Sequence, residues 1–225
     1  MRVNEIFRSI EGEGKRAGLP CTFIRLFGCN IRCSYCDSQY ACIGTDYTEM
    51  SIPQILEKVK SFEVTNVTVT GGEPLIHPGI EKLLNALLDE GYSVNVETNG
   101  TKEPLNLGRW EPVYGRNYKY MSDIFYTMDY KCPSSGMEHY MNKSIIDKLT
   151  KDDVLKFVVG SYEDLNAALE VIESIKSKPQ IYFSPVFGKI EASDIVQYLI
   201  DKKLYDCKVQ LQMHKYIWDP QERGV

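Results

Sequence analysis

The 225-residue sequence lacks the features that would direct a chain into or through a membrane. Its longest apolar runs, such as Thr22–Phe27 and Val154–Val159, fall far short of the roughly 18 residues that a membrane helix needs. Residues 1–16 hold three glutamates where a secretion signal would need an apolar stretch. We therefore expect a cytoplasmic protein with no membrane partner.

The sequence also lacks an excess of positive charge. Its 26 Lys and Arg residues are outnumbered by 31 Asp and Glu residues, which gives a net charge of −5. No global charge therefore attracts nucleic acid, and a small-molecule substrate is the expected partner. The chain has no low-complexity tract, no repeat and no Pro/Gly/Ser linker, so residues 1–225 are expected to form one domain.

Short apolar runs of strand length alternate with amphipathic stretches of helical length. Strands are expected at Cys21–Phe27, Asn66–Thr70, Tyr92–Glu97, Ile124–Asp129, Val154–Val159, Gln180–Ser184 and Lys208–Met213. Helices are expected at Ser51–Phe62, Pro78–Glu90, Glu163–Lys176 and Ser193–Lys203. This alternation predicts an α/β fold with a parallel sheet, either an open doubly wound sheet or a full or partial barrel. Residues 101–143 fit no clean periodicity and are rich in Tyr, so we expect an irregular insertion there.

Polar and turn-forming residues follow several of these strands directly. Examples are Thr70-Gly71-Gly72-Glu73-Pro74, Glu97-Thr98-Asn99-Gly100 and Asp129-Tyr130-Lys131. The carboxyl ends of parallel strands meet at one edge of a sheet or barrel, where α/β enzymes place their active sites. The sequence therefore predicts one shared site at that edge.

Seven cysteines are an odd number, which argues against a disulfide framework and for metal binding or a reactive thiol. Cys29, Cys33 and Cys36 form a tight C-x3-C-x2-C group. A structural zinc site needs four ligands, but the sequence has no second Cys pair and its histidines lie far away at 77, 139 and 214. A [4Fe–4S] cluster on three cysteines would leave one iron open to a non-protein ligand. The open cluster is favoured, with zinc and chance spacing as the alternatives.

This cysteine group, with Tyr35 just before its last member and Thr-Gly-Gly-Glu-Pro at 70–74, resembles the radical S-adenosylmethionine (SAM) enzymes. The resemblance implies a [4Fe–4S] cluster on the three cysteines and SAM on its open iron. It also implies that the Gly-Gly-Glu-Pro backbone meets the SAM amine, which glycine permits because it has no Cβ. An ordinary turn that closes a βα unit is the alternative interpretation of the same motif.

A closer resemblance covers nearly the whole chain. It is carried by Glu5–Phe7, Ile10–Gly14, Phe23–Asn30, Cys36–Ser38, Glu97–Gly100, Leu155–Val159 and Gln212–Tyr216. These segments resemble the 7-carboxy-7-deazaguanine synthase family of queuosine biosynthesis. The resemblance implies a partial (β/α)6 barrel, a homodimer, Mg2+ and a flavodoxin- or ferredoxin-type reductant. It implies a lyase that converts 6-carboxy-5,6,7,8-tetrahydropterin to 7-carboxy-7-deazaguanine with loss of ammonia.

The resemblance also assigns site residues. The substrate would be bound by Ile10, Glu11, Gly12, Arg25, Thr70 and Pro220. Arg25 would hold the substrate carboxylate and Glu97 would meet the heterocycle, so these two are the expected catalytic residues. SAM would be lined by Tyr35, Cys36, Asp37, Gly72, Asp129, Tyr130, Lys131, Ser184, Pro185, Val186 and Phe187. Ser38 would be the Mg2+ ligand.

The chain departs from the family at a few positions. The family commonly has Gln in place of Glu11, and Ser-Pro-Lys in place of Asp129-Tyr130-Lys131. Either Pro220 or the terminal carboxylate is expected at the substrate. Ordinary alternatives are a surface charge for Arg25, a barrel-interior ion pair for Lys156 and a packing role for His214.

Two other functions remain open. One is another small radical SAM enzyme, such as a glycyl-radical-enzyme activase. The other is a zinc-stabilised binding module without catalysis. An iron–sulfur protein is brown and a zinc protein is colourless, so colour separates these two classes.

Overall fold

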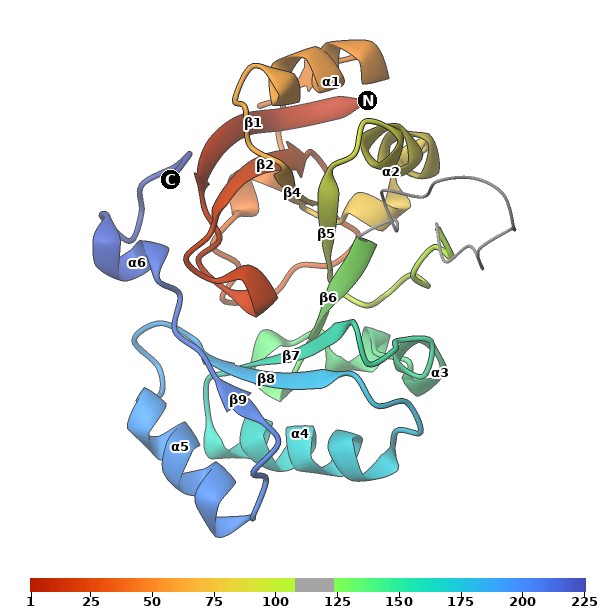
Figure 1. The fold of residues 1–225 in the computed structure, drawn as a ribbon. Coiled ribbons are helices and arrows are strands. Elements are labelled where there is room, and N and C mark those ends of the chain that lie inside the picture. The colour runs from red at the N-terminus through yellow and green to blue at the C-terminus, as the bar shows by residue number, and fades with distance from the viewer. Residues whose placement is uncertain (108–123) are drawn as a thin grey trace.

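A computed structural model describes residues 1–107 and 124–225 (Figure 1). Its strands are β1 (Arg2–Ile10), β2 (Pro20–Leu26), β3 (Thr48–Glu49), β4 (Asn66–Gly71), β5 (Ser93–Thr98), β6 (Ile124–Tyr130), β7 (Val154–Val159), β8 (Gln180–Pro185) and β9 (Lys208–Val209). Its α-helices are α1 (Ile52–Lys60), α2 (Ile80–Asp89), α3 (Lys143–Ile146), α4 (Tyr162–Ser174), α5 (Ala192–Asp201) and α6 (His214–Ile217).

All these strands belong to one sheet in the order β3-β1-β2-β4-β5-β6-β7-β8-β9. From β2 onward every neighbouring pair is parallel, whereas β1 runs antiparallel to both β2 and β3. The sheet curves, but β3 and β9 lie at its two ends and do not pair within the described residues. The predicted α/β class and partial barrel are therefore confirmed, and the barrel is open.

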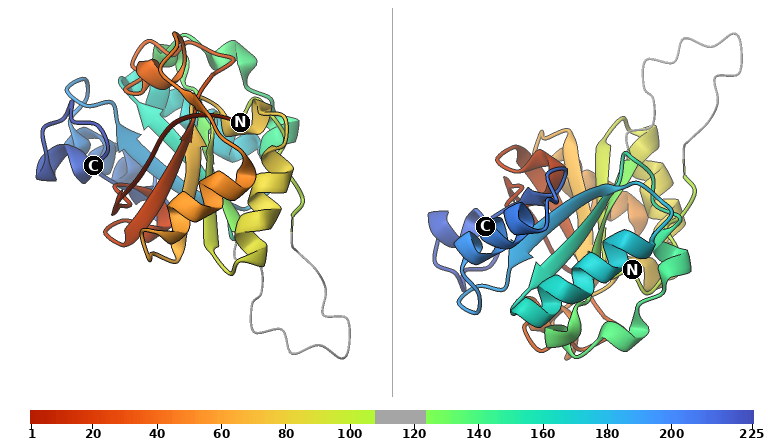
Figure 2. Two further views of the ribbon diagram at one scale, coloured as in Figure 1. Left: turned by 90° about the horizontal axis from the view of Figure 1, so that it is seen from above. Right: turned by 90° about the horizontal axis from the view of Figure 1, so that it is seen from below.

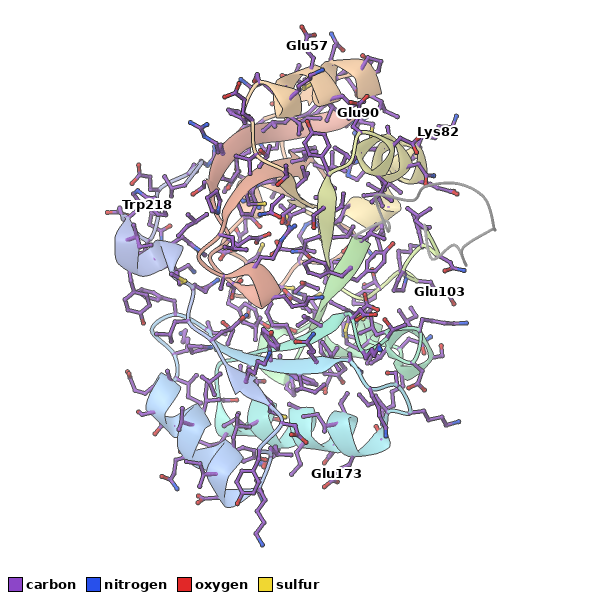
Figure 3. All side chains as sticks on the ribbon, viewed as in Figure 1. Glu57, Lys82, Glu90, Glu103, Glu173 and Trp218 are labelled. Atoms are coloured by element: carbon purple, nitrogen blue, oxygen red, sulfur yellow. The ribbon has the colours of Figure 1, made fainter. Side chains whose placement is uncertain are left out.

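The helices cover the outside of the curved sheet, with α1 and α2 over its first half and α4 and α5 over its second half (Figures 1 and 2). Each helix turns an apolar stripe inward, and Leu83 and Leu87 of α2 and Leu165 of α4 are fully buried. Charged residues of the same helices, including Glu57, Lys82 and Glu173, point outward (Figure 3). No described helix has the length and apolar character needed to span a membrane.

The inner face of the sheet is polar, which the expectation of continuously apolar strands did not anticipate. Side chains of a strand alternate between its two faces. The valines of β4 and β5, such as Val67 and Val94, join the core under the helices, while Thr68 and Asn95 occupy the alternate positions. Thr68 and Asn95 are buried and are joined by a hydrogen bond inside the barrel. The barrel interior is therefore built for polar contacts.

Most predicted elements match the structure to within two residues at each end. The strand expected at Lys208–Met213 is wrong beyond Val209, because the chain turns away from β8 and Met213 N donates to the Gly12 carbonyl (3.0 Å). Strand β1 was not predicted, since most of its residues are half-buried and mix charged with apolar side chains.

The expected insertion at 101–143 is not one irregular segment. Strand β6 runs through it, as the strand prediction required, and two short 3-10 turns, η4 (Pro133–Ser135) and η5 (Glu138–Tyr140), follow. Residues 108–123, which include Trp110 and Tyr114, lie outside the described residues, so the expectation for that part stays a prediction.

Candidate active site

A cavity of about 430 Å³ opens at the carboxyl ends of the parallel strands. Cys29, Cys33 and Cys36 line one side of it. Residues that end β4, β5 and β6, among them Gly72 and Asn99, line another. The strand-end residues singled out in the sequence therefore meet at one site.

Hydrogen bonds at its start and in its middle hold the loop that carries the three cysteines. Gly28 N donates to the Ala41 carbonyl (2.7 Å) where the loop begins. Further along, Ser34 N donates to the Ser135 carbonyl (3.0 Å) and Ser34 Oγ to the Ser134 carbonyl (2.6 Å), both in η4. The loop is thus fixed between β2 and the segment after β6.

The environment of the cysteines favours thiolates at two of them. A hydrogen bond from the Cys42 thiol is the main cause that lowers the pKa of Cys29 and of Cys36 to about 6, against the opposing effect of burial. Burial raises the pKa of Cys33, with neighbouring Lys131 opposing it. The same hydrogen bonds to Cys29 and Cys36 raise the pKa of Cys42, which keeps its proton. Thiolates are the form of cysteine that binds iron.

The donor set fits an iron–sulfur cluster better than a single ion. Among the residues that the structure describes, no three His, Cys, Asp or Glu side chains converge closely enough to surround one metal ion. A structural zinc requires four ligands on one ion. In a [4Fe–4S] cluster each cysteine binds a different iron, so three cysteines around one cavity suffice.

The Gly-Gly-Glu-Pro segment supports this loop from β4. A Cβ on Gly72 would lie 2.2 Å from the Gly28 carbonyl oxygen and 2.9 Å from Cys29 Cβ, so only glycine fits there. Glu73 N also donates to the Gly28 carbonyl (2.8 Å). The Glu73 carboxylate is buried and accepts from Asn99 N (2.6 Å), and burial raises its pKa to about 7. The motif therefore locks β4, β5 and the cysteine loop together.

A second cavity of about 150 Å³ adjoins the first. The two share seven lining residues, which are Glu13, Arg25, Asp37, Ser38, Glu97, Gln212 and Lys215. The second cavity is lined further by Ile10, Glu11, Gly12 and Pro220, four of the residues expected at the substrate, and their role there stays a prediction. Thr70 lines the first cavity. The site thus has two compartments with a charged boundary.

Arg25 lies on β2 at this boundary. Its Nε donates to Glu5 Oε1 (2.8 Å), and Tyr40 Oη donates to the same oxygen (3.0 Å). Although burial opposes it, Tyr40 and Glu5 raise the pKa of Arg25, so the guanidinium stays charged. Only 18% of the side chain is exposed, which makes the surface-charge alternative wrong. Within residues 1–107 and 124–225, its terminal nitrogens make no hydrogen bond and can bind an anionic ligand.

Lys156 is the centre of a charged cluster inside the barrel. Its Nζ lies 3.0 Å from Glu13 Oε2 and 3.1 Å from Asp129 Oδ1. Although burial opposes it, Asp129 and Glu13 raise the pKa of Lys156. The barrel-interior ion pair proposed as its ordinary role is therefore present.

Glu97 faces the same cluster. Burial raises its pKa to about 7, with Lys156 opposing the shift and Glu11 and Glu13 adding to it. Within the described part of the chain, no hydrogen bond to the Glu97 carboxylate is found. A carboxyl group that titrates near neutral pH at the boundary of two cavities is suited to contact a ligand.

The predicted SAM residues divide into two groups. Those that line the larger cavity are Tyr35, Cys36, Asp37, Gly72, Asp129, Lys131, Val186 and Phe187. Tyr130 instead packs in the core against Phe157 and lies 3.4 Å from Glu138. Ser184 and Pro185 end β8, and Ser184 Oγ donates to Glu13 Oε1 (3.0 Å).

The C-terminal segment closes the second cavity. Met213 N donates to the Gly12 carbonyl (3.0 Å), and a Cβ on Gly12 would lie 2.2 Å from His214 Nδ1. His214 thus packs against Gly12, as its ordinary interpretation expected. Lys215 Nζ lies 3.3 Å from Asp37 Oδ2. Both Pro220 and the terminal Val225 line the cavity.

Several lining residues had no assigned site role in the sequence, namely Glu13, Asn99, Cys42, Gln212 and Lys215. Glu13 and Lys215 lie within segments that carried the family resemblance, which was the available signal. Cys42 gave none, because nothing in its spacing links it to the C-x3-C-x2-C group.

Comparison with known proteins agrees with this geometry. The family model described as the radical SAM superfamily matches residues 23–108. A 7-carboxy-7-deazaguanine synthase from Clostridium acetobutylicum is 44% identical, with 100% of this chain and 99% of the relative covered. The synthase from Chlorobaculum tepidum is 38% identical, with 100% of this chain and 97% of the relative covered.

Solved structures share the fold. QueE from Escherichia coli matches with a TM-score of 0.72 at 24% identity, over 95% of this chain and 94% of that one. Streptococcus suis SuiB bound to S-adenosylmethionine matches with a TM-score of 0.54 at 14% identity, over 82% of this chain and 48% of that one.

Proposed function

The chain belongs to the 7-carboxy-7-deazaguanine synthase family of radical SAM enzymes, and on this premise we propose that it forms 7-carboxy-7-deazaguanine from 6-carboxy-5,6,7,8-tetrahydropterin. One ring nitrogen leaves as ammonia in this ring contraction. The observation that carries the proposal is the adjacency of the two cavities. The compartment that holds the three cysteines shares Arg25, Glu97 and five further lining residues with the second compartment.

The cofactors of the family are a [4Fe–4S] cluster and SAM. When bound, they supply a carbon radical that removes a hydrogen atom from the substrate. Cys29, Cys33 and Cys36 hold the cluster. The proposed SAM residues on the strand ends, including Gly72, Asp129 and Lys131, line the space next to these cysteines. Mixed charges there suit the ammonium and carboxylate of an amino acid.

The substrate residues bind the substrate and fix its orientation. Arg25 binds the substrate carboxylate through its terminal nitrogens, because Glu5 already occupies Nε. Glu97 accepts hydrogen bonds from the N–H groups of the heterocycle. The backbone of Ile10, Glu11 and Gly12 forms the wall behind it. Held this way, the reacting carbon faces the larger cavity at close range, which reaction without diffusion requires.

Further parts of the proposal extend the family pattern. Ser38 lines both cavities, and its hydroxyl is a suitable oxygen ligand for Mg2+ near the substrate. A flavodoxin- or ferredoxin-type protein delivers the electron. Residues 1–225 form one radical SAM core domain, which acts as a homodimer in the cytoplasm.

An anaerobic assay tests the function directly. The iron-loaded protein is incubated with 6-carboxy-5,6,7,8-tetrahydropterin, SAM and a reductant, and the product is identified by mass spectrometry. The expected result is 7-carboxy-7-deazaguanine. Iron-loaded protein that cleaves SAM but leaves the pterin unchanged would favour a different radical SAM activity, and a colourless protein that binds zinc would favour the non-catalytic module.

A variant pair tests the role of Arg25. Arg25→Ala is expected to raise KM by at least about tenfold, because hydrogen bonds to a charged group are worth about 1.5–3 kcal/mol. Arg25→Lys keeps the charge but loses the two parallel hydrogen bonds of a guanidinium. Its KM is therefore expected to lie between those of the unsubstituted protein and Arg25→Ala. An unchanged KM in Arg25→Ala removes this residue from the substrate site.

A further inference from the structure

Two arginines lie close to the ring of one tyrosine at the second cavity. Tyr40, in the short 3-10 turn η2 (Gln39–Ala41), is half-buried and lines this cavity. The Cζ atoms of Arg25 and Arg223 lie 5.8 Å and 3.4 Å from its ring centroid. Both distances are within the roughly 6 Å at which an aromatic ring attracts a cation. Tyr40 therefore contacts both Arg25 and a residue of the C-terminal segment.

The hydroxyl of Tyr40 also reaches Arg25, through Glu5 of β1. Tyr40 Oη donates to Glu5 Oε1 (3.0 Å), and Arg25 Nε donates to the same oxygen (2.8 Å). Because Nε is bound to a carboxylate that is itself held, the plane of the guanidinium is restricted. Its two terminal nitrogens are then left to a ligand.

Phe7 is the other aromatic neighbour of Arg25, with its ring centroid 5.9 Å from Cζ. It pairs with Phe23 across β1 and β2 and stacks on it, with the centroids 5.0 Å apart. Phe7 is therefore fixed by the sheet. Tyr40 belongs to a turn, and its side chain is held by Glu5 and Arg223.

Arg223 ties the C-terminal segment to the same place. Besides its contact with the Tyr40 ring, its Nη1 lies 3.1 Å from Asp46 Oδ2. Both members of this ion pair are exposed, so the pair alone contributes little. The residues on either side of Arg223, Glu222 and Gly224, line the second cavity. Arg223 therefore holds one wall of that cavity against Tyr40.

We propose that Tyr40 is a positioning residue that orients the Arg25 guanidinium for a carboxylate ligand, and that Arg223 keeps Tyr40 in place. A guanidinium binds a carboxylate through two parallel hydrogen bonds, so a small rotation loses one of them. The seating of the C-terminal segment and the alignment of Arg25 are thus coupled. This inference rests on the proposed function, in which Arg25 binds the substrate carboxylate.

A direct contact between Tyr40 and the substrate is the alternative, because Tyr40 lines the second cavity. A positioning residue acts only through Arg25, whereas a direct contact acts without it. Independent contacts have additive effects on the free energy of binding, and coupled ones do not. A double-mutant cycle with Arg25 therefore distinguishes the two.

The test measures the Kd of 6-carboxy-5,6,7,8-tetrahydropterin by anaerobic titration calorimetry. Each full-length, iron-loaded protein is titrated with SAM present and without reductant, so that no turnover occurs. Tyr40→Phe removes the hydroxyl and keeps the ring. Arg223→Ala removes the cation, and Arg223→Lys keeps it. Tyr40→Phe and Arg223→Ala are also each combined with Arg25→Ala, and Arg25→Gln replaces Arg25→Ala if the alanine variant loads no iron.

Two matched variants are the controls. The ring of Tyr47 also lies beside an arginine, 5.1 Å from Arg2 Cζ, and Arg8 is exposed like Arg223. Neither Tyr47 nor Arg8 lines either cavity described above. Tyr47→Phe and Arg8→Ala are therefore expected to bind the pterin like the unsubstituted protein.

Tyr40→Phe is expected to raise Kd about two- to tenfold, the range of one net hydrogen bond. Arg223→Ala is expected to raise it about two- to fivefold, the range of one cation–π contact at an exposed site. Arg223→Lys should restore most of the affinity. In the Arg25→Ala background, neither substitution should weaken binding further.

Two results overturn the inference. One is an unchanged Kd in either Tyr40→Phe or Arg223→Ala. The other is an effect of full size in the Arg25→Ala background, which indicates a direct contact with the substrate.

The failure of the inference and the failure of the proposed function are distinguishable. An unsubstituted, iron-loaded protein that does not bind the pterin contradicts the proposed function and overturns the inference with it. Binding that depends on Arg25 but not on Tyr40 or Arg223 contradicts only the inference.

Discussion

Two groups of buried ion pairs lie inside the barrel, at opposite ends of its strands. Near the amino ends, Arg16 pairs with Glu11 (2.9 Å) and also donates to the backbone carbonyls of Val67 (3.1 Å) and Ser93 (3.0 Å). Near the carboxyl ends, Lys156 pairs with Glu13 and Asp129. Lys156 borders the larger cavity, whereas Arg16 lines neither cavity described here.

The contacts of Arg16 and of Lys156 differ, and the difference shows which buried charge stabilises the fold and which can contact a ligand. Both terminal nitrogens of Arg16 are used by strands of the sheet, so this side chain closes the bottom of the barrel. Beside the Lys156 cluster, burial raises the pKa of Glu97 to about 7 although Lys156 opposes the shift, and both side chains line the larger cavity. A buried charge whose terminal nitrogens are bound by the strands around it stabilises the fold, and one that lies beside an acid without a hydrogen-bond partner is available to a ligand.

The largest expected effect separates cysteines at the two ends. Cys33→Ala at the carboxyl end should abolish iron loading and activity, because the cluster loses one of three ligands. Cys21→Ser, beside Glu11 and Thr68 at the amino end, should keep both and lose roughly 1 kcal/mol of stability. Iron analysis, activity and urea unfolding check the pair. Full iron content in Cys33→Ala would remove it from the ligand set.

The next effect is on stability. Arg16→Met should lower the free energy of unfolding by about 3–5 kcal/mol, because it leaves Glu11 charged and unpaired in the interior. Adding Glu11→Gln removes that charge and should recover part of the loss. Urea unfolding of both singles and the double variant measures the coupling. Strict additivity of the two substitutions would show that the pair is not the cause.

Glu97 gives a smaller, pH-dependent effect at the other end. If its carboxylate accepts from the heterocycle, kcat/KM should rise with pH through about 7 as Glu97 ionises. Glu97→Gln should lower kcat/KM at pH 8 roughly tenfold and abolish its rise with pH through about 7. The measurement is kcat/KM of both proteins as a function of pH. If the rise near pH 7 persists in Glu97→Gln, the ionisation belongs to another group.

The same pKa shift has a consequence for stability. The folded pKa of Glu97 lies above the unfolded value of 4.5. The unfolded chain therefore releases the proton first, and the contribution of Glu97 to stability falls as pH rises from 4.5 to about 7. Glu97→Gln should flatten that part of the stability curve, which urea unfolding at several pH values can measure.

The smallest expected effect concerns Mg2+ at Ser38. Activity should rise with Mg2+, and Ser38→Thr should keep this response because it keeps the hydroxyl. Ser38→Ala should need roughly tenfold more Mg2+ for half-maximal activity, which corresponds to about 1.4 kcal/mol. Equal Mg2+ dependence in all three proteins would place the cation elsewhere.

The sequence predicted the parts of this fold whose signals are local. Helix α1 begins at the capping box of Ser51 and Gln54, and β7 has the bounds that its apolar run predicted. Strand β1 escaped prediction because its stability comes from pairing with β2 and not from an apolar pattern of its own. Long-range pairing of this kind leaves little trace in one sequence.

In the site, too, residues with a local sequence signal were predicted and residues that arrive by long-range contacts were not. The three cysteines could be identified because cluster ligands that share one loop must lie close together in the sequence. The role of Arg25 came from family resemblance alone, whereas Glu97 was also indicated by its place at the end of a predicted strand. Cys42 and Lys215 reach the site by a turn and by the return of the C-terminal segment, and neither path is encoded in local spacing.

The second cavity is walled by two segments that lie far apart in the sequence. Apart from Glu97, its lining comes from positions 7–40 and from positions 212–225. During synthesis the chain emerges from its amino end, so residues 212–225 must leave the ribosome before this compartment can close. Until then the cysteine loop and strands β2 to β6 are already available, and the compartment beside them stands open. The order of translation therefore delays completion of the proposed active site until this segment has been made, and the second cavity, which takes seven lining residues from it, depends on it most.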